Sequence, residues 1–283
     1  MPRTYDDANA ANIAKDNGNY AEAIRLYARA LEVGGLSQAN QAAAYNNRGM
    51  AYKELGQYNE AIADYNAALR IDPNNFYAYV NRGIVYKVQG QYDKAIVDYD
   101  AALRINPNEA VIYNDRGNAY MSKGQSDKAL ADYGTAIRLN PNYAKAYNNR
   151  CAEYIDMGLF EKAIADCDTA IRLNPDYANA YNGRARAYNE RGEDAKGLPD
   201  AEKAVALKPN DSSSIETRAM IYEKLGQRDR AVADYTAALT LDPKMNEAAE
   251  GLKRLSADQN PAGSWRGTVY QTGPGSATSS YSA

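Results

Sequence analysis

The sequence predicts an all-α protein built as a solenoid, in which short helical hairpins stack one on the next. The first observation is a repeat: the pattern Tyr-x-x-Arg followed by a small residue starts at Tyr45 and recurs, with one substitution, every 34 residues. The second is a column of prolines with the same step, from Pro73 to Pro243. The third is the spacing of three and four residues between apolar positions inside each unit, which indicates helix faces. Six units in one register are the signature of a stacked array.

Each unit is predicted to hold two helices. The first covers 42–55 in the unit of Tyr45, and Gly56 ends it where a positive φ is needed. The second is expected to start from an N-cap at Asn59, with Asp93, Asp127 and Asp229 in the equivalent position. The proline then closes the unit.

The predicted units lie near 4–37, 42–75, 76–109, 110–143, 144–177, 178–211 and 212–245, followed by a capping helix at 246–255. The unit at 4–37 is divergent, because its first helix lacks the tyrosines and the arginine. The solenoid therefore spans 1–255. Residues 256–283 are rich in Gly and Ser and have no periodicity, so we expect them to be disordered.

Three columns of small residues face one another in the predicted hairpins, and they begin at Gly49, Ala61 and Ala68. Small side chains let two helices approach closely, and tyrosines fill the space around them. The order Tyr45, Gly49, Tyr52, Ala61, Tyr65, Ala68, Pro73 resembles the tetratricopeptide repeat, and in particular an Asn-Arg-Gly subtype found in bacterial proteins. This resemblance implies a right-handed superhelix of helix pairs with a concave inner face that binds other proteins.

The composition excludes most enzyme chemistry. The chain has no histidine, which removes Ser-His and Cys-His pairs and the common zinc sites, and two cysteines are too few for a four-thiolate site. No phosphate-binding glycine loop is present. The formal net charge of −3 argues against nucleic acid as a partner. We expect no enzyme activity, no cofactor and no metal.

Localisation follows from what the sequence lacks. No apolar run is long enough to span a membrane, and the first residues lack the apolar stretch of a secretory signal. The expectation is a cytoplasmic protein, with a periplasmic or secreted one as the alternative if an upstream leader was omitted.

The recurring arginine predicts a structural ion-pair ladder. A buried arginine is costly unless paired, and an aspartate follows each one by sixteen residues. The divergent unit has Ala10 and Leu26 in these two columns, which favours pairing within a unit over pairing with the preceding unit. The rival interpretation makes the arginines ligand contacts in the groove. The predicted pairs are Arg48–Asp64, Arg82–Asp98, Arg116–Asp132, Arg150–Asp166, Arg184–Asp200 and Arg218–Asp234.

Asparagines recur where the first helix of each unit is expected to face the groove. Asn offers both a donor and an acceptor, which suits an extended peptide backbone, and the arrangement resembles the asparagine ladder of O-linked N-acetylglucosamine transferases. Solvated or turn-capping amides are the alternative. The predicted ladder breaks at Asp115, Gly183 and Thr217. The candidate ligand residues are Asn46, Asn47, Tyr77, Asn81, Asn114, Asp115, Asn118, Lys145, Asn148, Asn149, Asn182 and Arg186.

Two further features depart from the repeat. Cys151 and Cys167 fall on facing helices of one unit, and in a reducing cytoplasm we expect free, buried thiols rather than a disulfide, a preference that an omitted leader would weaken. Pro199 falls inside a predicted second helix, so that helix is expected to start late or to kink.

The sequence as a whole predicts a non-catalytic scaffold that holds a peptide or partner segment in its concave groove. One alternative is an RNA-binding helical-repeat protein, which the acidic pI and the strict 34-residue step disfavour. Another is a carboxylate-based hydrolase, but acids that follow the repeat are better explained as ladder members. The identity of the partner is not encoded in the pattern, and self-association stays open.

Overall fold

The computed structural model describes residues 2–257, and every element in that range is an α-helix. Helices α1 to α14 form seven antiparallel hairpins, and α15 packs on the last one. The bounds are α1 Pro2–Asp16, α2 Tyr20–Val33, α3 Gln38–Glu54, α4 Tyr58–Ile71, α5 Phe76–Val88, α6 Tyr92–Ile105, α7 Ala110–Ser122, α8 Ser126–Leu139, α9 Ala144–Asp156, α10 Phe160–Leu173, α11 Ala178–Glu190, α12 Asp194–Leu207, α13 Ser212–Lys224, α14 Arg228–Leu241 and α15 Asn246–Ala257.

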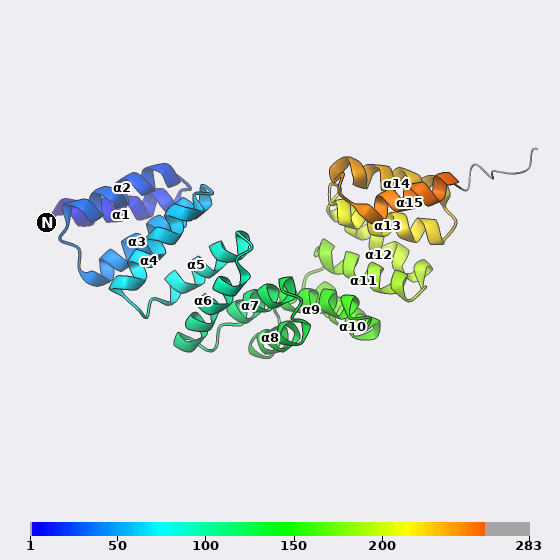
Figure 1. Cartoon of the computed structure of the whole chain (residues 1–283), viewed down its shortest axis with the longest axis horizontal. Coiled ribbons are helices and arrows are strands. Elements are labelled where there is room, and N and C mark those ends of the chain that lie inside the picture. Colours follow the sequence, from blue (N-terminus) through cyan, green and yellow to red (C-terminus); the bar gives the residue numbers. More distant parts are fainter. Residues whose placement is uncertain (1, 258–283) are drawn as a thin grey trace, which may run out of the picture.

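The hairpins follow one another along an arch, with α1 and α2 at one end and α13 to α15 at the other (Figure 1). The backbone of each odd-numbered helix comes within 8 Å, Cα to Cα, of the next odd-numbered helix, whereas consecutive even-numbered helices of the described chain do not approach so closely. Helices that stay in contact lie on the inside of a curve. The odd-numbered helices therefore form the inner, concave wall, and this all-α superhelix is the fold class that the repeat predicts.

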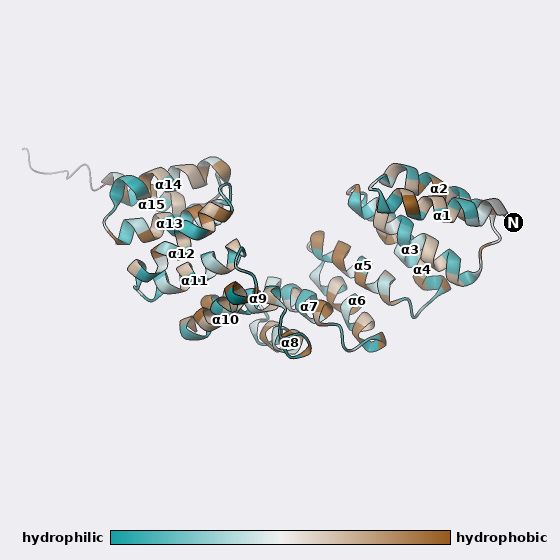
Figure 2. Cartoon of the chain, turned by 180° about the vertical axis from the view of Figure 1, so that it is seen from behind, coloured by the Kyte–Doolittle hydropathy of each residue, from teal (hydrophilic) through white to brown (hydrophobic). Residues whose placement is uncertain are grey.

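In three hairpins, α3–α4, α5–α6 and α7–α8, a tyrosine ring of the second helix packs on a glycine of the first. A Cβ atom added to Gly83 would lie 2.8 Å from the ring of Tyr99, and one added to Gly117 would lie 2.7 Å from Tyr133, so no side chain fits at either glycine. Alanines such as Ala95 and Ala102 complete the seam with no exposed surface. Polar and apolar segments alternate along the helices, as expected when each helix has one packed face (Figure 2).

Several helix ends differ from the sequence-based expectation. Helix α3 starts at Gln38 rather than 42, because the Ser37 side chain accepts a hydrogen bond from the backbone N–H of Asn40 and caps the helix earlier. The capping helix α15 extends to Ala257, two residues beyond its predicted end. Gly56 does end the first helix of its unit, with φ of 73°.

The N-cap predicted at Asn59 is wrong. Helix α4 starts one residue earlier, at Tyr58, and its N-cap is Gln57, which makes no side-chain capping bond. The aspartates in the Asn59 column lie in the first turn instead, where a negative charge is stabilised by the helix dipole; they are Asp93, Asp127 and Asp229.

A late start at Pro199 is also wrong. Helix α12 begins at Asp194, in the same column as its sister helices, and Pro199 lies inside it on the exposed side. The predicted disordered segment, from Ser256 onward, lies outside the described residues except for Ser256 and Ala257, which belong to α15.

Candidate functional site

Each arginine of the repeat makes a two-bonded contact with the aspartate sixteen residues later. In the unit of Arg82, Nε and Nη2 donate to the two carboxylate oxygens of Asp98 at 2.8 and 2.6 Å. The Asp98 side chain is 3% exposed, and that of Arg82 is 18% exposed. The same geometry recurs for Arg48–Asp64, Arg116–Asp132, Arg150–Asp166, Arg184–Asp200 and Arg218–Asp234.

Three arginines also reach back to the preceding unit through Nη1. The acceptors lie sixteen residues before each arginine, and they are Asn66 for Arg82, Asp100 for Arg116 and Asp168 for Arg184. Pairing within a unit and pairing with the preceding unit are therefore not exclusive. This second set was not predicted from the sequence, although the same spacing, counted toward the N-terminus, would have found it.

The arginines are also enclosed by aromatic rings of their own helix. The guanidinium carbon of Arg82 lies 5.7 Å from the ring centre of Tyr79 and 5.9 Å from that of Tyr86, within cation–π range. Burial raises the pKa of Asp98, and the hydrogen bonds from Arg82 act in the opposite direction. These contacts orient Arg82 toward the even-numbered helix α6 and leave little of it for a ligand.

The predicted asparagine ladder is bridged from unit to unit. Nδ2 of Asn81 donates to Oδ1 of Asn46 at 3.1 Å. Nδ2 of Asn149 donates to Oδ1 of both Asn114 and Asn118, each at 2.9 Å. The amides are thus neither simply solvated nor used as turn caps, because much of their hydrogen-bonding capacity holds neighbouring inner helices together.

Some ladder groups keep free capacity. Oδ1 of Asn81 accepts no hydrogen bond from the described residues, and Nδ2 of Asn118 donates none, while Oδ1 of Asn118 accepts from Tyr133. Asn47 donates to Asn12 at 3.1 Å, and Asn148 donates to its neighbour Asn149. The free oxygen and the free N–H belong to the inner helices α5 and α7.

The other predicted ligand residues divide into free and engaged ones. Tyr77 is 69% exposed, and Lys145 is exposed with no ion pair to the described residues. Asp115 accepts from Lys87 at 2.7 Å, and Arg186 pairs with Asp156 at 3.1 Å. Asn182 has a buried Oδ1 without a protein partner among the described residues.

Exposed apolar side chains lie on the same two helices as the free ladder groups. Tyr77 and Val88 on α5 are 69% and 56% exposed, and Val111 and Met121 on α7 are 49% and 36% exposed. We call these four residues the apolar stripe. The sequence pointed only to Tyr77 among them, because exposure at the other positions depends on the curvature of the stack.

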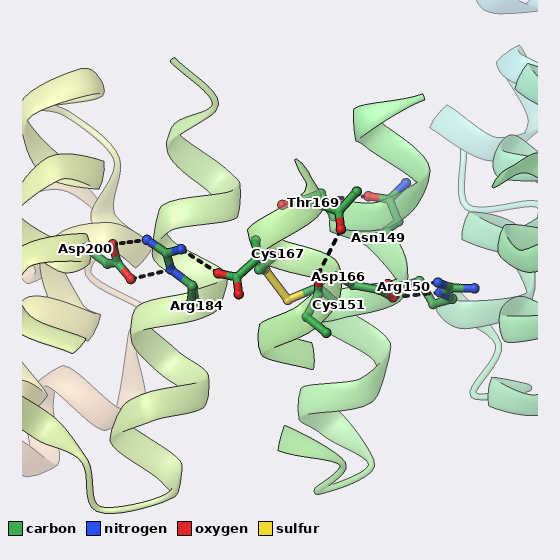
Figure 3. Close-up of a disulfide and its surroundings, with 11 residues drawn as sticks. Asn149, Arg150, Cys151, Asp166, Cys167, Thr169, Arg184 and Asp200 are labelled. Atoms are coloured by element: carbon green, nitrogen blue, oxygen red, sulfur yellow. Dashed lines mark hydrogen bonds and ion pairs between the residues drawn. A yellow bond between two sulfur atoms is a disulfide. The ribbon is translucent and has the colours of Figure 1, made fainter. Parts of the chain in front are cut away.

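Cys151 and Cys167 are joined by a disulfide between α9 and α10 (Figure 3), so the expectation of free thiols is wrong. They occupy the positions that glycine and tyrosine hold in the three preceding hairpins. Their Cα atoms lie 5.7 Å apart, a separation that a disulfide spans. A Cβ atom added to Gly183 would lie 2.9 Å from Sγ of Cys167. The disulfide therefore leaves no room for a side chain at Gly183, the position where the ladder is interrupted.

The divergent first unit has an ion pair of its own. Arg29 on α2 donates to Asp7 on α1. The equivalent positions of the later units carry no such ion pair. Within residues 2–257 we find no group of His, Cys, Asp and Glu side chains arranged to hold a metal ion. No helix of that range has the length and apolarity needed to cross a membrane.

Family models match most of the chain. Models described as tetratricopeptide repeat match residues 8–36, 76–109, 98–131, 144–177 and 213–245, and one described as TPR repeat matches 49–90 and 117–151. A comparison with curated proteins finds no significant match.

Solved structures show the same fold. A tetratricopeptide repeat protein from Parabacteroides merdae is 21% identical with a TM-score of 0.73, over 90% of this chain and 100% of that one. MamA is 26% identical with a TM-score of 0.54, over 60% of this chain and 93% of that one. YrrB, described as a TPR protein with an unusual peptide-binding site, is 22% identical with a TM-score of 0.54, over 67% and 95%.

Proposed function

Since the chain belongs to the tetratricopeptide repeat family, whose members are in general non-catalytic protein-interaction scaffolds, we propose that its concave wall binds an extended segment of a partner protein across α5 and α7. The observation that carries this proposal is the combination of a free amide oxygen on Asn81 and a free amide N–H on Asn118 with the apolar stripe. A peptide backbone presents one donor and one acceptor per residue, so it complements such a pair.

The bridged amides support the proposal through orientation. An asparagine whose side chain is already held by a neighbouring unit loses little rotamer freedom when a ligand binds. Asn118 is held in this way by bonds from Tyr133 and Asn149 to its Oδ1. The two N–H groups on its Nδ2 are therefore preorganised donors.

The apolar stripe supplies the second half of the contact. Burial of an exposed tyrosine or valine side chain stabilises a complex by about 1.5–3 kcal/mol when the burial is complete. Within the apolar stripe, Tyr77 lies at the start of α5 and Val111 lies at the start of α7. We propose that apolar side chains of the partner pack here, while its backbone bonds to the amides. YrrB, a similar repeat stack, is described as having a peptide-binding site, and this description agrees with the assignment.

The disulfide bears on localisation. Disulfides persist in oxidising compartments and are rare in the cytoplasm of mesophiles. We therefore propose the periplasmic or extracellular alternative over the cytoplasmic one, on the ground that Cys151 and Cys167 are bonded. Acid-quenched, denatured cell extracts treated with a thiol-reactive mass tag test this proposal, since two labelled cysteines in the native host would contradict it.

Selection of peptides from a displayed random library on the purified protein tests the binding site. We expect the selected peptides to lose about tenfold in affinity with Asn118→Asp, which keeps an oxygen for the bonds from Tyr133 and Asn149 but replaces the free N–H groups by a second oxygen. Tyr77→Ala is expected to cause a similar loss. Asn59→Ala, an exposed amide on α4 with no hydrogen bond to the described residues, is the control. Selected peptides that bind both inner-wall variants as well as the control would refute the assignment.

A further inference from the structure

A small cleft lies at the N-terminal end of the inner wall, between α1 and α3. Its volume is about 110 Å³. The walls come from matching faces of the two helices, at positions 5, 8, 9 and 12 of α1 and 40, 43, 44 and 47 of α3, which is the spacing of one helix stripe. Alanines occupy the middle of both stripes and leave the space open. The polar lining residues are Tyr5, Asn9, Asn12, Tyr27, Asn40 and Asn47.

The cleft is lined by four asparagine amides and no charged side chain of the described residues. Oδ1 of Asn12 accepts from the Tyr27 hydroxyl and from Nδ2 of Asn47, so its Nδ2 keeps both N–H groups free. The side chains of Asn9 and Asn40 make no hydrogen bond to the described residues. The cleft therefore offers several donors and several acceptors at once.

The hydroxyl of Tyr27 stabilises this arrangement. Burial raises the pKa of Tyr27 to about 12, so the phenol stays protonated near neutral pH and remains a donor to Asn12. Asn12 is then held from two sides, by Tyr27 and by Asn47, and its free N–H groups keep one orientation.

The chemistry of the lining selects a neutral ligand. The rim of the cleft is exposed, and its floor is formed by the buried Tyr27 and the partly buried Asn12 and Asn47. A carboxylate or an ammonium group that reaches this floor would lose hydration without gaining an opposite charge, which is costly. A carboxamide has one donor group and one acceptor, and it pairs with an asparagine amide through two hydrogen bonds. About 110 Å³ holds three to four water molecules at their liquid volume, which suits one side chain of this kind.

We propose that the cleft between α1 and α3 binds the carboxamide side chain of a glutamine or asparagine in the partner segment. This inference rests on the proposed function, because the cleft lies on the same wall as the ladder and shares Asn47 with it. The segment that crosses α5 and α7 thus has a second, polar anchor at the N-terminal end of the solenoid.

A probe of single-residue size tests the cleft separately from the wall. The protein, labelled with ¹⁵N in its asparagine side chains, is titrated with N-acetylglutamine methylamide and with the glutamate and methionine analogues. We expect saturable shifts of the Asn12 and Asn40 side-chain signals with the glutamine probe. The glutamate and methionine probes should bind about tenfold more weakly, because the loss of one hydrogen bond of average strength changes a dissociation constant by about this factor. Equal shifts with the methionine probe, or no saturation with any probe, would overturn the proposal.

Variants complete the test. Asn40→Ala removes an amide with no internal bond and is expected to weaken the glutamine probe about tenfold, whereas Asn59→Ala leaves it unchanged. Asn118→Asp lies outside the cleft and should not alter binding of the probe. Loss of probe binding in Asn118→Asp, or its retention in Asn40→Ala, contradicts the cleft assignment. Probe binding without any selected peptide would instead contradict only the proposed groove.

Discussion

Replacing Arg82 by alanine is expected to destabilise the solenoid more than replacing its partner Asp98. Arg82→Ala leaves Asp98, 3% exposed at its side chain, with no other hydrogen bond to the described residues. Breaking a buried pair in this way costs about 3–5 kcal/mol. Asp98→Ala leaves Arg82 with its bond to Asn66, with two tyrosine rings and with 18% exposure to water. We expect its cost to be about 1–3 kcal/mol.

The pH dependence identifies the cause. Burial raises the pKa of Asp98, and Arg82→Ala removes the hydrogen bonds and the charge that oppose this rise. A carboxyl whose folded pKa exceeds its unfolded pKa takes up protons on folding, so the folded state gains stability as the pH falls. The loss caused by Arg82→Ala should therefore shrink between about pH 7 and pH 5. Adding Asp98→Asn should restore stability at pH 7 and remove this dependence.

Urea unfolding measures these differences in the free energy of unfolding. The single tryptophan, Trp265, lies outside the described residues, so the far-UV circular dichroism of the helices is followed rather than tryptophan fluorescence. Arg104→Ala, an exposed arginine on the same hairpin without a partner among the described residues, is the control and should change the free energy of unfolding by less than about 0.5 kcal/mol. Equal costs for Arg82→Ala and Asp98→Ala, with no effect of pH, would refute the idea that the ladder is a set of buried, mutually dependent charges.

Three further tests, one of them a reduction of the disulfide, give distinct expectations. Tyr99→Phe should be neutral or slightly stabilising, because its buried hydroxyl has no partner among the described residues, whereas Tyr133→Phe should cost about 1 kcal/mol for the lost bond to Asn118; comparable thermal shifts in both would contradict this. Reducing the Cys151–Cys167 disulfide, which spans sixteen residues, should lower the free energy of unfolding by about 3 kcal/mol, and insensitivity to reductant would count against it. Gly183→Ala should cost about 1–3 kcal/mol in the oxidised protein and less when both cysteines are alanine; an equal cost in the two backgrounds would exclude a clash with Cys167.

The hydroxyl of Tyr99, which has no partner among the described residues, shows a limit of what the repeat pattern predicts. Tyr99 and Tyr133 occupy the same column, but residue 84 on the facing helix is Ile where residue 118 is Asn. Of these two tyrosines, only the second therefore finds an acceptor among the described residues. The column predicts burial of both rings, while satisfaction of each hydroxyl depends on a contact across the hairpin.

The bond between Cys151 and Cys167 illustrates the same limit. Their spacing indicates facing helices, but oxidation depends on a Cα separation that only the packed hairpin defines. The resulting sulfur position also leaves no space for a side chain at Gly183 in the next unit, a contact that the sequence does not reveal.

The amino-acid sequence alone determined the all-α repeat, its family and the sixteen-residue spacing of arginine and aspartate, because these are local patterns that recur with a fixed period. The tertiary structure decided which amides are engaged, which apolar side chains stay exposed on the inner wall and where a cleft opens between α1 and α3. These features depend on how closely neighbouring hairpins approach and how the stack curves. Both quantities arise from many small packing contacts between units, and no single column of the repeat encodes them.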